Sequence, residues 1–224
     1  MKTKQMAFAK ALLGVLIFSG CAGVPTMPTK DDERHVAVCL VNDQSALVSQ
    51  ETKIAAFARI AGEWRERVGV VFAIAEEHGY YEDAASEFPL PGIRLGMHLR
   101  NLCPKSEARF LFSNRTLFQT DSENFTYQPE ESPQGVILEG YSNSYYGYLI
   151  LPRADEQFST IRNREPALLH VFRHELGHLF GLNDNLDSSG FMYPFLLSSQ
   201  GKWTYYLTKT ISSRKHAVRW FPDK

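Results

Sequence analysis

The segment HELGHLFGLND, residues 174–184, is the most informative part of the sequence for both fold and chemistry. Residues four apart on a helix lie on one face, so His174 and His178 project side by side and can bind one zinc ion. Glu175 follows the first histidine, where it can act as general base on a metal-bound water. We therefore expect a helix that carries part of a catalytic zinc site.

The end of this helix supplies the candidate third ligand. Gly181 permits a sharp turn without a Cβ penalty, and such a turn can return Asp184 to the metal. A fourth position then stays open for water, as in catalytic rather than structural zinc sites. The alternative is that Asp184 only bonds to backbone groups at the helix exit. The opposite side of the helix is apolar and predicts packing on a core: Leu169, Phe172, Leu176, Leu179 and Phe180.

Eight residues after Asp184 comes Met192, within the run Gly-Phe-Met-Tyr-Pro. With this run the sequence resembles the metzincin zinc peptidases, in which H-E-x-x-H-x-x-G-x-x-H is followed by a methionine turn. It is most similar to the matrixin branch, although Asp184 replaces the third histidine, as in snapalysin-like metzincins. The resemblance is specific over residues 166–194, and it implies that Met192 lies beneath the metal as an apolar floor.

The remaining chain predicts an α+β fold. Apolar and β-branched runs predict strands, and helical spacing of apolar residues predicts helices. We expect strands at 36–41, 68–75, 93–99, 109–113, 116–120, 136–139 and 148–151, and helices at 51–67, 166–181 and 209–220. This order fits a zincin- or metzincin-like twisted mixed sheet of about five strands with three main helices. Residues 36–224 would form one catalytic domain.

The N-terminus has the pattern of an export signal. Residues 1–20 carry three lysines and then the short apolar run Ala11–Phe18. The end Phe-Ser-Gly-Cys resembles a bacterial lipobox, which implies acylation of Cys21 and a linker over residues 21–35. An ordinary secreted protein and an uncleaved anchor are the alternatives. The expected location is the bacterial cell envelope, held to the membrane by lipid, and the outer membrane if the host is diderm.

Two cysteines remain after the signal, Cys39 and Cys103. Export favours oxidation, so a disulfide between them is predicted. Two buried free thiols are the alternative, because cysteine packs well as a small apolar residue. Cys39 also faintly resembles the cysteine that caps the zinc in matrixin zymogens.

Composition limits the partners. With 44% hydrophobic residues, a net charge of −1 and no long basic run, the chain predicts a globular domain without a nucleic-acid surface. Adjacent acids such as Glu76 and Glu77 lack EF-hand spacing, so no structural Ca²⁺ is expected. We expect a monomer.

The sequence therefore predicts a zinc-dependent endopeptidase with one catalytic Zn²⁺ and a protein or peptide substrate. By resemblance, the substrate would pair with an edge strand within Gly135–Ser144, and the loop Phe195–Trp203 would shape its main pocket. One rival is a non-catalytic zinc-binding envelope lipoprotein that binds a partner in the cleft. Another is a zinc hydrolase that acts on something other than protein.

Overall fold

The computed structural model describes residues 32–43, 50–80, 92–113, 117–119, 125–126, 136–138, 140–151, 167–185, 190–193 and 202–220. The expected signal peptide, Cys21 and the first part of the linker lie outside these residues. So do most of the loop Phe195–Trp203 and the expected helix start at Pro166. The predictions for these parts therefore stay predictions.

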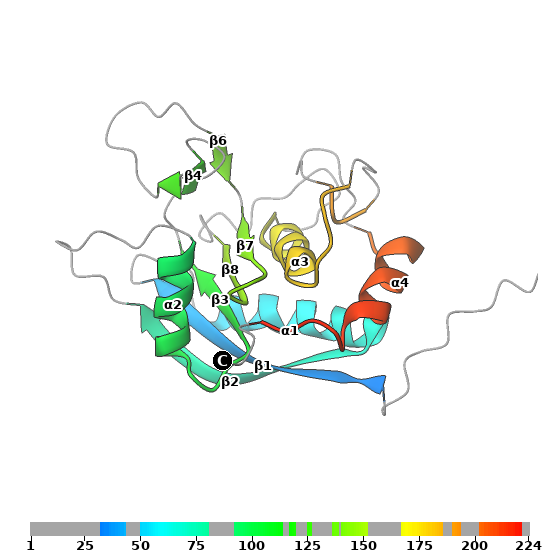
Figure 1. Cartoon of the computed structure of the whole chain (residues 1–224), viewed down its shortest axis with the longest axis horizontal. Helices are drawn as coiled ribbons and strands as arrows, with labels where there is room; N and C mark the ends of the chain where they lie inside the picture. The colour runs from blue at the N-terminus through cyan, green and yellow to red at the C-terminus, as the bar shows by residue number, and fades with distance from the viewer. Residues whose placement is uncertain are drawn as a thin grey trace, which may run out of the picture.

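A five-stranded mixed sheet forms the centre of the fold (Figure 1). Its strands, in spatial order, are β2 (Val70–Tyr80), β1 (Arg34–Asp43), β3 (Ala108–Phe112), β8 (Tyr148–Leu151) and β7 (Tyr141–Asn143). The first four are parallel to one another, and β7 runs antiparallel to β8 at the edge. The predicted α+β fold with about five strands in one sheet is confirmed.

A second, antiparallel sheet has three short strands: β5 (Phe125–Thr126), β4 (Leu117–Gln119) and β6 (Val136–Leu138). The sequence predicted β4 and β6 as strands, but it did not separate them from the main sheet. The range Gly135–Ser144 covers both β6 and the edge strand β7.

The two faces of the main sheet carry different helices. Alternate β1 residues, such as Val36 and Val38, join the core formed with α1 (Gln50–Val68) and α3 (Ala167–Leu179). Cys39 and Val41 point to the opposite face, where α2 (Ile93–Leu102) packs. Since neighbouring strand residues point to opposite faces, β1 is buried on both sides.

Helix α1 and helix α3 meet through Trp64, whose buried ring lies 4.9 Å from that of Phe180. None of the described helices is long and apolar enough to cross a membrane.

The strand predicted at 93–99 is wrong, because these residues belong to helix α2 (Ile93–Leu102). Leu95 and Leu99 are buried, and their spacing fits a helix as well as a strand. Ile93 and Met97 distinguish the helix from the strand. In a strand they would lie on the same buried face as Leu95 and Leu99. They are 65% and 46% exposed, so the helix period describes the segment.

The last helix begins earlier than the predicted range 209–220, as α4 (Tyr205–Arg214). Thr204 caps it by accepting the backbone N–H of Leu207 at 3.3 Å, which fixes the start. The chain leaves the helix at Lys215, a buried residue whose ammonium donates to the Val68 carbonyl at 2.9 Å.

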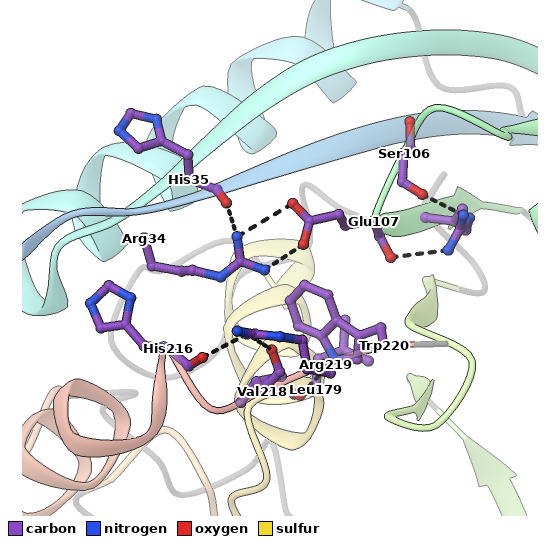
Figure 2. Close-up of polar contacts among 10 residues, drawn as sticks. Arg34, His35, Ser106, Glu107, Leu179, His216, Val218, Arg219 and Trp220 are labelled. Carbon is purple, nitrogen blue, oxygen red and sulfur yellow. Dashed lines mark hydrogen bonds and ion pairs between the residues drawn. The ribbon is translucent and has the colours of Figure 1, made fainter. Parts of the chain in front are cut away.

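Trp220 fastens the C-terminal segment to the end of α3. Its indole N–H donates to the Leu179 carbonyl at 3.0 Å (Figure 2), satisfying an acceptor that a helix end leaves unpaired. Gly147 makes room for this side chain, because a Cβ there would lie 2.6 Å from Trp220 Cβ. The C-terminal segment thus helps to fix the helix that carries both histidines.

A disulfide joins Cys39 on β1 to Cys103 at the end of α2, across a sequence separation of 64. Such a bridge restricts the unfolded chain, and for a loop of this length the expected stabilisation of the folded state is about 4 kcal/mol.

We expect the double variant Cys39→Ala/Cys103→Ala to lose up to that free energy of unfolding in urea titrations. Zinc affinity should not change, since the bridge and α3 lie on opposite faces of the sheet. A large loss of zinc affinity in a folded double variant would contradict this separation.

Candidate metal centre

His174 and His178 lie on α3 with their Nε2 atoms 3.1 Å apart. The other ring nitrogens are engaged by backbone: His174 Nδ1 lies 3.0 Å from the Phe191 carbonyl and His178 Nδ1 2.8 Å from that of Leu182. A carbonyl oxygen can only accept, so each Nδ1 carries the proton in these bonds. In the neutral form, each imidazole held in this way presents an Nε2 lone pair, as metal-binding histidines do.

Burial, together with the neighbouring His178, lowers the pKa of His174 below its ordinary value. The uncharged imidazole is the form that binds a metal ion.

The end of α3 forms a Schellman turn. Gly181 has φ of 76°, its N–H donates to the His178 carbonyl at 2.9 Å, and the Leu182 N–H donates to the Gly177 carbonyl at 3.1 Å. The same turn brings the Leu182 carbonyl to His178. It also sends the chain back so that Asp184 approaches both imidazoles. Glycine is suited to the turn because other residues adopt this φ only with strain.

Asp184 Oδ1 lies 3.3 Å from His174 Nε2 and 3.4 Å from His178 Nε2. With the third edge of 3.1 Å, these atoms form a nearly equilateral triangle. Two ligands about 2.05 Å from a zinc ion at the tetrahedral angle are about 3.3 Å apart. Three acceptor atoms at this spacing repel one another until a cation or a proton lies between them. The donor set therefore fits zinc.

Glu175 lies next to this triangle and is almost fully buried at 6% exposure. Burial raises its pKa to about 8, whereas a hydrogen bond with the Ser142 side chain acts in the opposite direction. Gly140, just before β7, packs so closely that a Cβ there would overlap the Glu175 carboxyl group. The edge strand of the sheet thus holds this carboxyl group in one place.

Met192 is fully buried and packs against Gly177, where an added Cβ would overlap its sulfur. Gly177 lies three residues after His174, so these two residues are neighbours on the helix surface. The Asn185 N–H donates to the Met192 carbonyl at 2.8 Å, which ties the chain after Asp184 to the methionine turn. Met192 is therefore an apolar neighbour of the turn of α3 that contains Gly177, between the two histidines in sequence.

The structure brings together the residues that the motif singled out: His174, Glu175, His178, Asp184 and Met192. Sequence reasoning missed Ser142 and Gly140, which approach Glu175 from β7. It also missed the two carbonyls that orient the histidines. No local pattern marks Ser142, Gly140 or the Phe191 carbonyl, because these contacts join segments that are distant in the sequence, whereas the Leu182 carbonyl lies only four residues after His178.

A second group within the described residues has metal-ligand spacing: Cys39, His78 and Cys103. Its two sulfurs form the disulfide, so they are not thiolates that could bind a metal.

Together, the five-stranded mixed sheet, the helices on one of its faces and a histidine pair on α3 define a zincin-like α+β domain. No protein-family model matches the sequence, and no curated protein matches it. Among solved structures, an archaemetzincin from Methanopyrus kandleri is similar at a TM-score of 0.56 and 15% identity, over 81% of this chain and 96% of that chain. This likeness shows the fold.

Two further structures have lower scores. Metalloproteinase-II from Bacteroides fragilis has a TM-score of 0.47 and 10% identity, over 83% of this chain and 53% of that chain. A zinc-dependent peptidase from Methanocorpusculum labreanum has a TM-score of 0.45 and 14% identity, over 78% of this chain and 99% of that chain.

Gly177→Ala tests the contact between α3 and the methionine turn. The added methyl group must displace the Met192 sulfur, so we expect a loss of about 1–3 kcal/mol in unfolding free energy. Zinc affinity should fall with it, because Met192 directly follows Phe191, whose carbonyl orients His174. Gly62→Ala on α1 is the matched control: no heavy atom lies within 4 Å of its added Cβ. The control should gain about 0.4–1 kcal/mol. Equal stability changes in the two variants would refute the close contact.

Proposed function

We propose that this chain is a zinc-dependent endopeptidase of the metzincin type, most similar to the matrixin branch, that acts on proteins or peptides. One observation carries the proposal: three acceptor atoms converge at zinc spacing beside a buried carboxyl group on the same helix. A structural zinc site has no need of that carboxyl group. The shared fold with an archaemetzincin supports the same conclusion.

In this proposal His174, His178 and Asp184 hold one zinc ion. When bound, zinc would lower the pKa of a coordinated water and polarise the scissile carbonyl. Glu175 would accept a proton from the attacking water and deliver one to the leaving amine. Ser142 would keep the Glu175 carboxyl group turned toward the substrate side, since it hydrogen-bonds to that group from β7.

The edge strand β7 is the proposed site for the substrate backbone. It is the last strand of the sheet, and its residues are half-buried. An extended peptide can add to such an edge by backbone hydrogen bonds. Because Gly140 and Ser142 adjoin Glu175, a peptide on this edge would pass beside the catalytic carboxyl group. The loop Phe195–Trp203 would contribute side-chain specificity.

We further propose acylation of Cys21, which would hold a monomeric domain at the surface of a bacterial envelope membrane. Residues 22–31 separate this cysteine from Asp32, whose carboxylate contacts the Lys215 ammonium at 2.8 Å. Ten linker residues span at most about 35 Å, so the domain would stay close to the membrane.

Two alternative functions differ in what happens to a molecule bound at the metal centre. A non-catalytic zinc-binding lipoprotein would bind zinc and a partner without cleaving it. A zinc hydrolase of another class would need Glu175 but would ignore peptides. Zinc content measured together with cleavage of a mixed peptide library separates all three.

Glu175→Gln tests the general base. The variant keeps the shape of the side chain, so zinc should remain at one ion per chain. Its kcat/KM for a library-derived peptide should fall by about 10²- to 10⁴-fold, because proton transfer is lost. Glu66→Gln, an exposed position on α1, is the control. Zinc binding without cleavage in the wild type would favour the binding protein, and undiminished cleavage in the variant would rule out Glu175 as base.

Asp184→Ala tests the third ligand. Changes around a metal ligand commonly cost 10- to 100-fold in affinity, so loss of a ligand itself should weaken zinc binding by about 100-fold or more. Competition with a chromophoric chelator measures the change. The exposed neighbour Asn183, changed to Ala, is the control. If Asp184→Ala binds zinc as tightly as the wild type, Asp184 is only a helix-exit residue.

A further inference from the structure

We propose that Glu63, on α1, is a positioning residue for the metal centre, a role that rests on the function proposed above. Glu63 does not belong to the ligand set. It joins α1 to two segments that set the direction of His174: α3 itself, through Arg173, and the methionine turn, through Trp203.

The first link is a two-pronged ion pair. Arg173 Nε donates to Glu63 Oε2 at 2.9 Å, and Arg173 Nη2 donates to Oε1 at 3.1 Å. The Arg173 side chain is only 4% exposed, so this geometry is held in a low-dielectric setting where charge-assisted bonds are strong. Arg173 precedes His174 on α3. Fixing its direction fixes the rotation of the helix turn that carries His174.

The second link runs through an aromatic side chain. Trp203 Nε1 donates to the same Glu63 Oε2 at 3.4 Å. Its ring lies 4.9 Å from the ring of Phe191 and 5.2 Å from that of Trp64. The Phe191 N–H donates to the Lys202 carbonyl at 3.2 Å, so the two segments are also joined by backbone. Glu63 thereby holds Trp203 and Phe191 as one unit against α1.

These contacts close a circuit at His174. The Phe191 carbonyl is the acceptor for His174 Nδ1 at 3.0 Å, and it keeps Nε2 turned toward Asp184 and His178. One path from Glu63 reaches His174 through Trp203 and Phe191. The other reaches it through Arg173. We call the five residues on these two paths the Glu63 circuit: Glu63, Arg173, His174, Phe191 and Trp203.

The negative charge of Glu63 should also favour zinc binding. Without its carboxylate, the buried guanidinium of Arg173 would lie one residue from a site for a divalent cation. A net positive charge nearby opposes cation binding, and the Glu63 carboxylate offsets part of that charge. Loss of Glu63 should therefore weaken zinc binding both by loosening Phe191 and by removing one negative charge beside Arg173.

Glu63→Gln in the full chain is the test, with zinc affinity measured by competition with a chromophoric chelator. We expect affinity to fall about tenfold, the lower end of the range for groups that orient ligands. Cobalt(II) in place of zinc gives a second readout, since its visible spectrum reports ligand geometry and should change in shape. Glu66→Gln, exposed on the same helix, is the matched control and should leave both readouts at their wild-type values.

Trp203→Phe keeps a smaller aromatic ring next to Phe191 and removes the N–H that donates to Glu63, so it serves if Glu63→Gln does not fold. It should weaken zinc binding a few-fold and shift the cobalt spectrum in the same sense. Weaker zinc binding with a changed spectrum in either variant supports the circuit, even if the wild type cleaves no peptide and the proposed function fails. Wild-type zinc affinity and an unchanged spectrum in a less stable Glu63→Gln variant would show that Glu63 only joins helices.

Discussion

The mutual repulsion of three acceptor atoms governs how the surrounding helix, turn and strand are arranged. His174, His178 and Asp184 approach within 3.1–3.4 Å of one another, and their acceptor atoms repel unless a proton or a cation lies between them. The backbone maintains this arrangement through the Phe191 and Leu182 carbonyls. A bound cation would turn the repulsion into coordination, so ion binding should also stabilise the fold.

The metal centre and the disulfide lie on opposite faces of the main sheet. The disulfide and α2 cover one face, while α1, α3 and α4 pack on the face that presents the metal centre. On the face that carries the metal centre, aromatic rings pack against one another. Trp64, at 0% exposure, contacts Phe72, Phe180 and Trp203. Such rings pack densely and resist displacement, which suits a face that must hold ligands to within fractions of an ångström.

Local periodicity was enough to predict the parts of the site that lie on one helix and its turn. Helical spacing placed His174 beside His178, and the glycine at 181 explained how Asp184 could return. The same kind of reasoning failed at 93–99, where Leu95 and Leu99 fit both periods and only burial of the neighbours distinguishes them. It could not reach Ser142, because its contact with Glu175 depends on how β7 pairs with β8.

The burial of Glu175 and the convergence of the three acceptor atoms are two unfavourable features that one cation would relieve together. A carboxylate removed from water carries a large desolvation cost unless opposite charge lies close by. Asp184 adds a second negative charge to the same region, which a histidine in its place would not do. A divalent cation balances both carboxylates, whereas without one Glu175 holds a proton at neutral pH, because burial raises its pKa to about 8. Both features therefore point to the same occupant, independently of any motif.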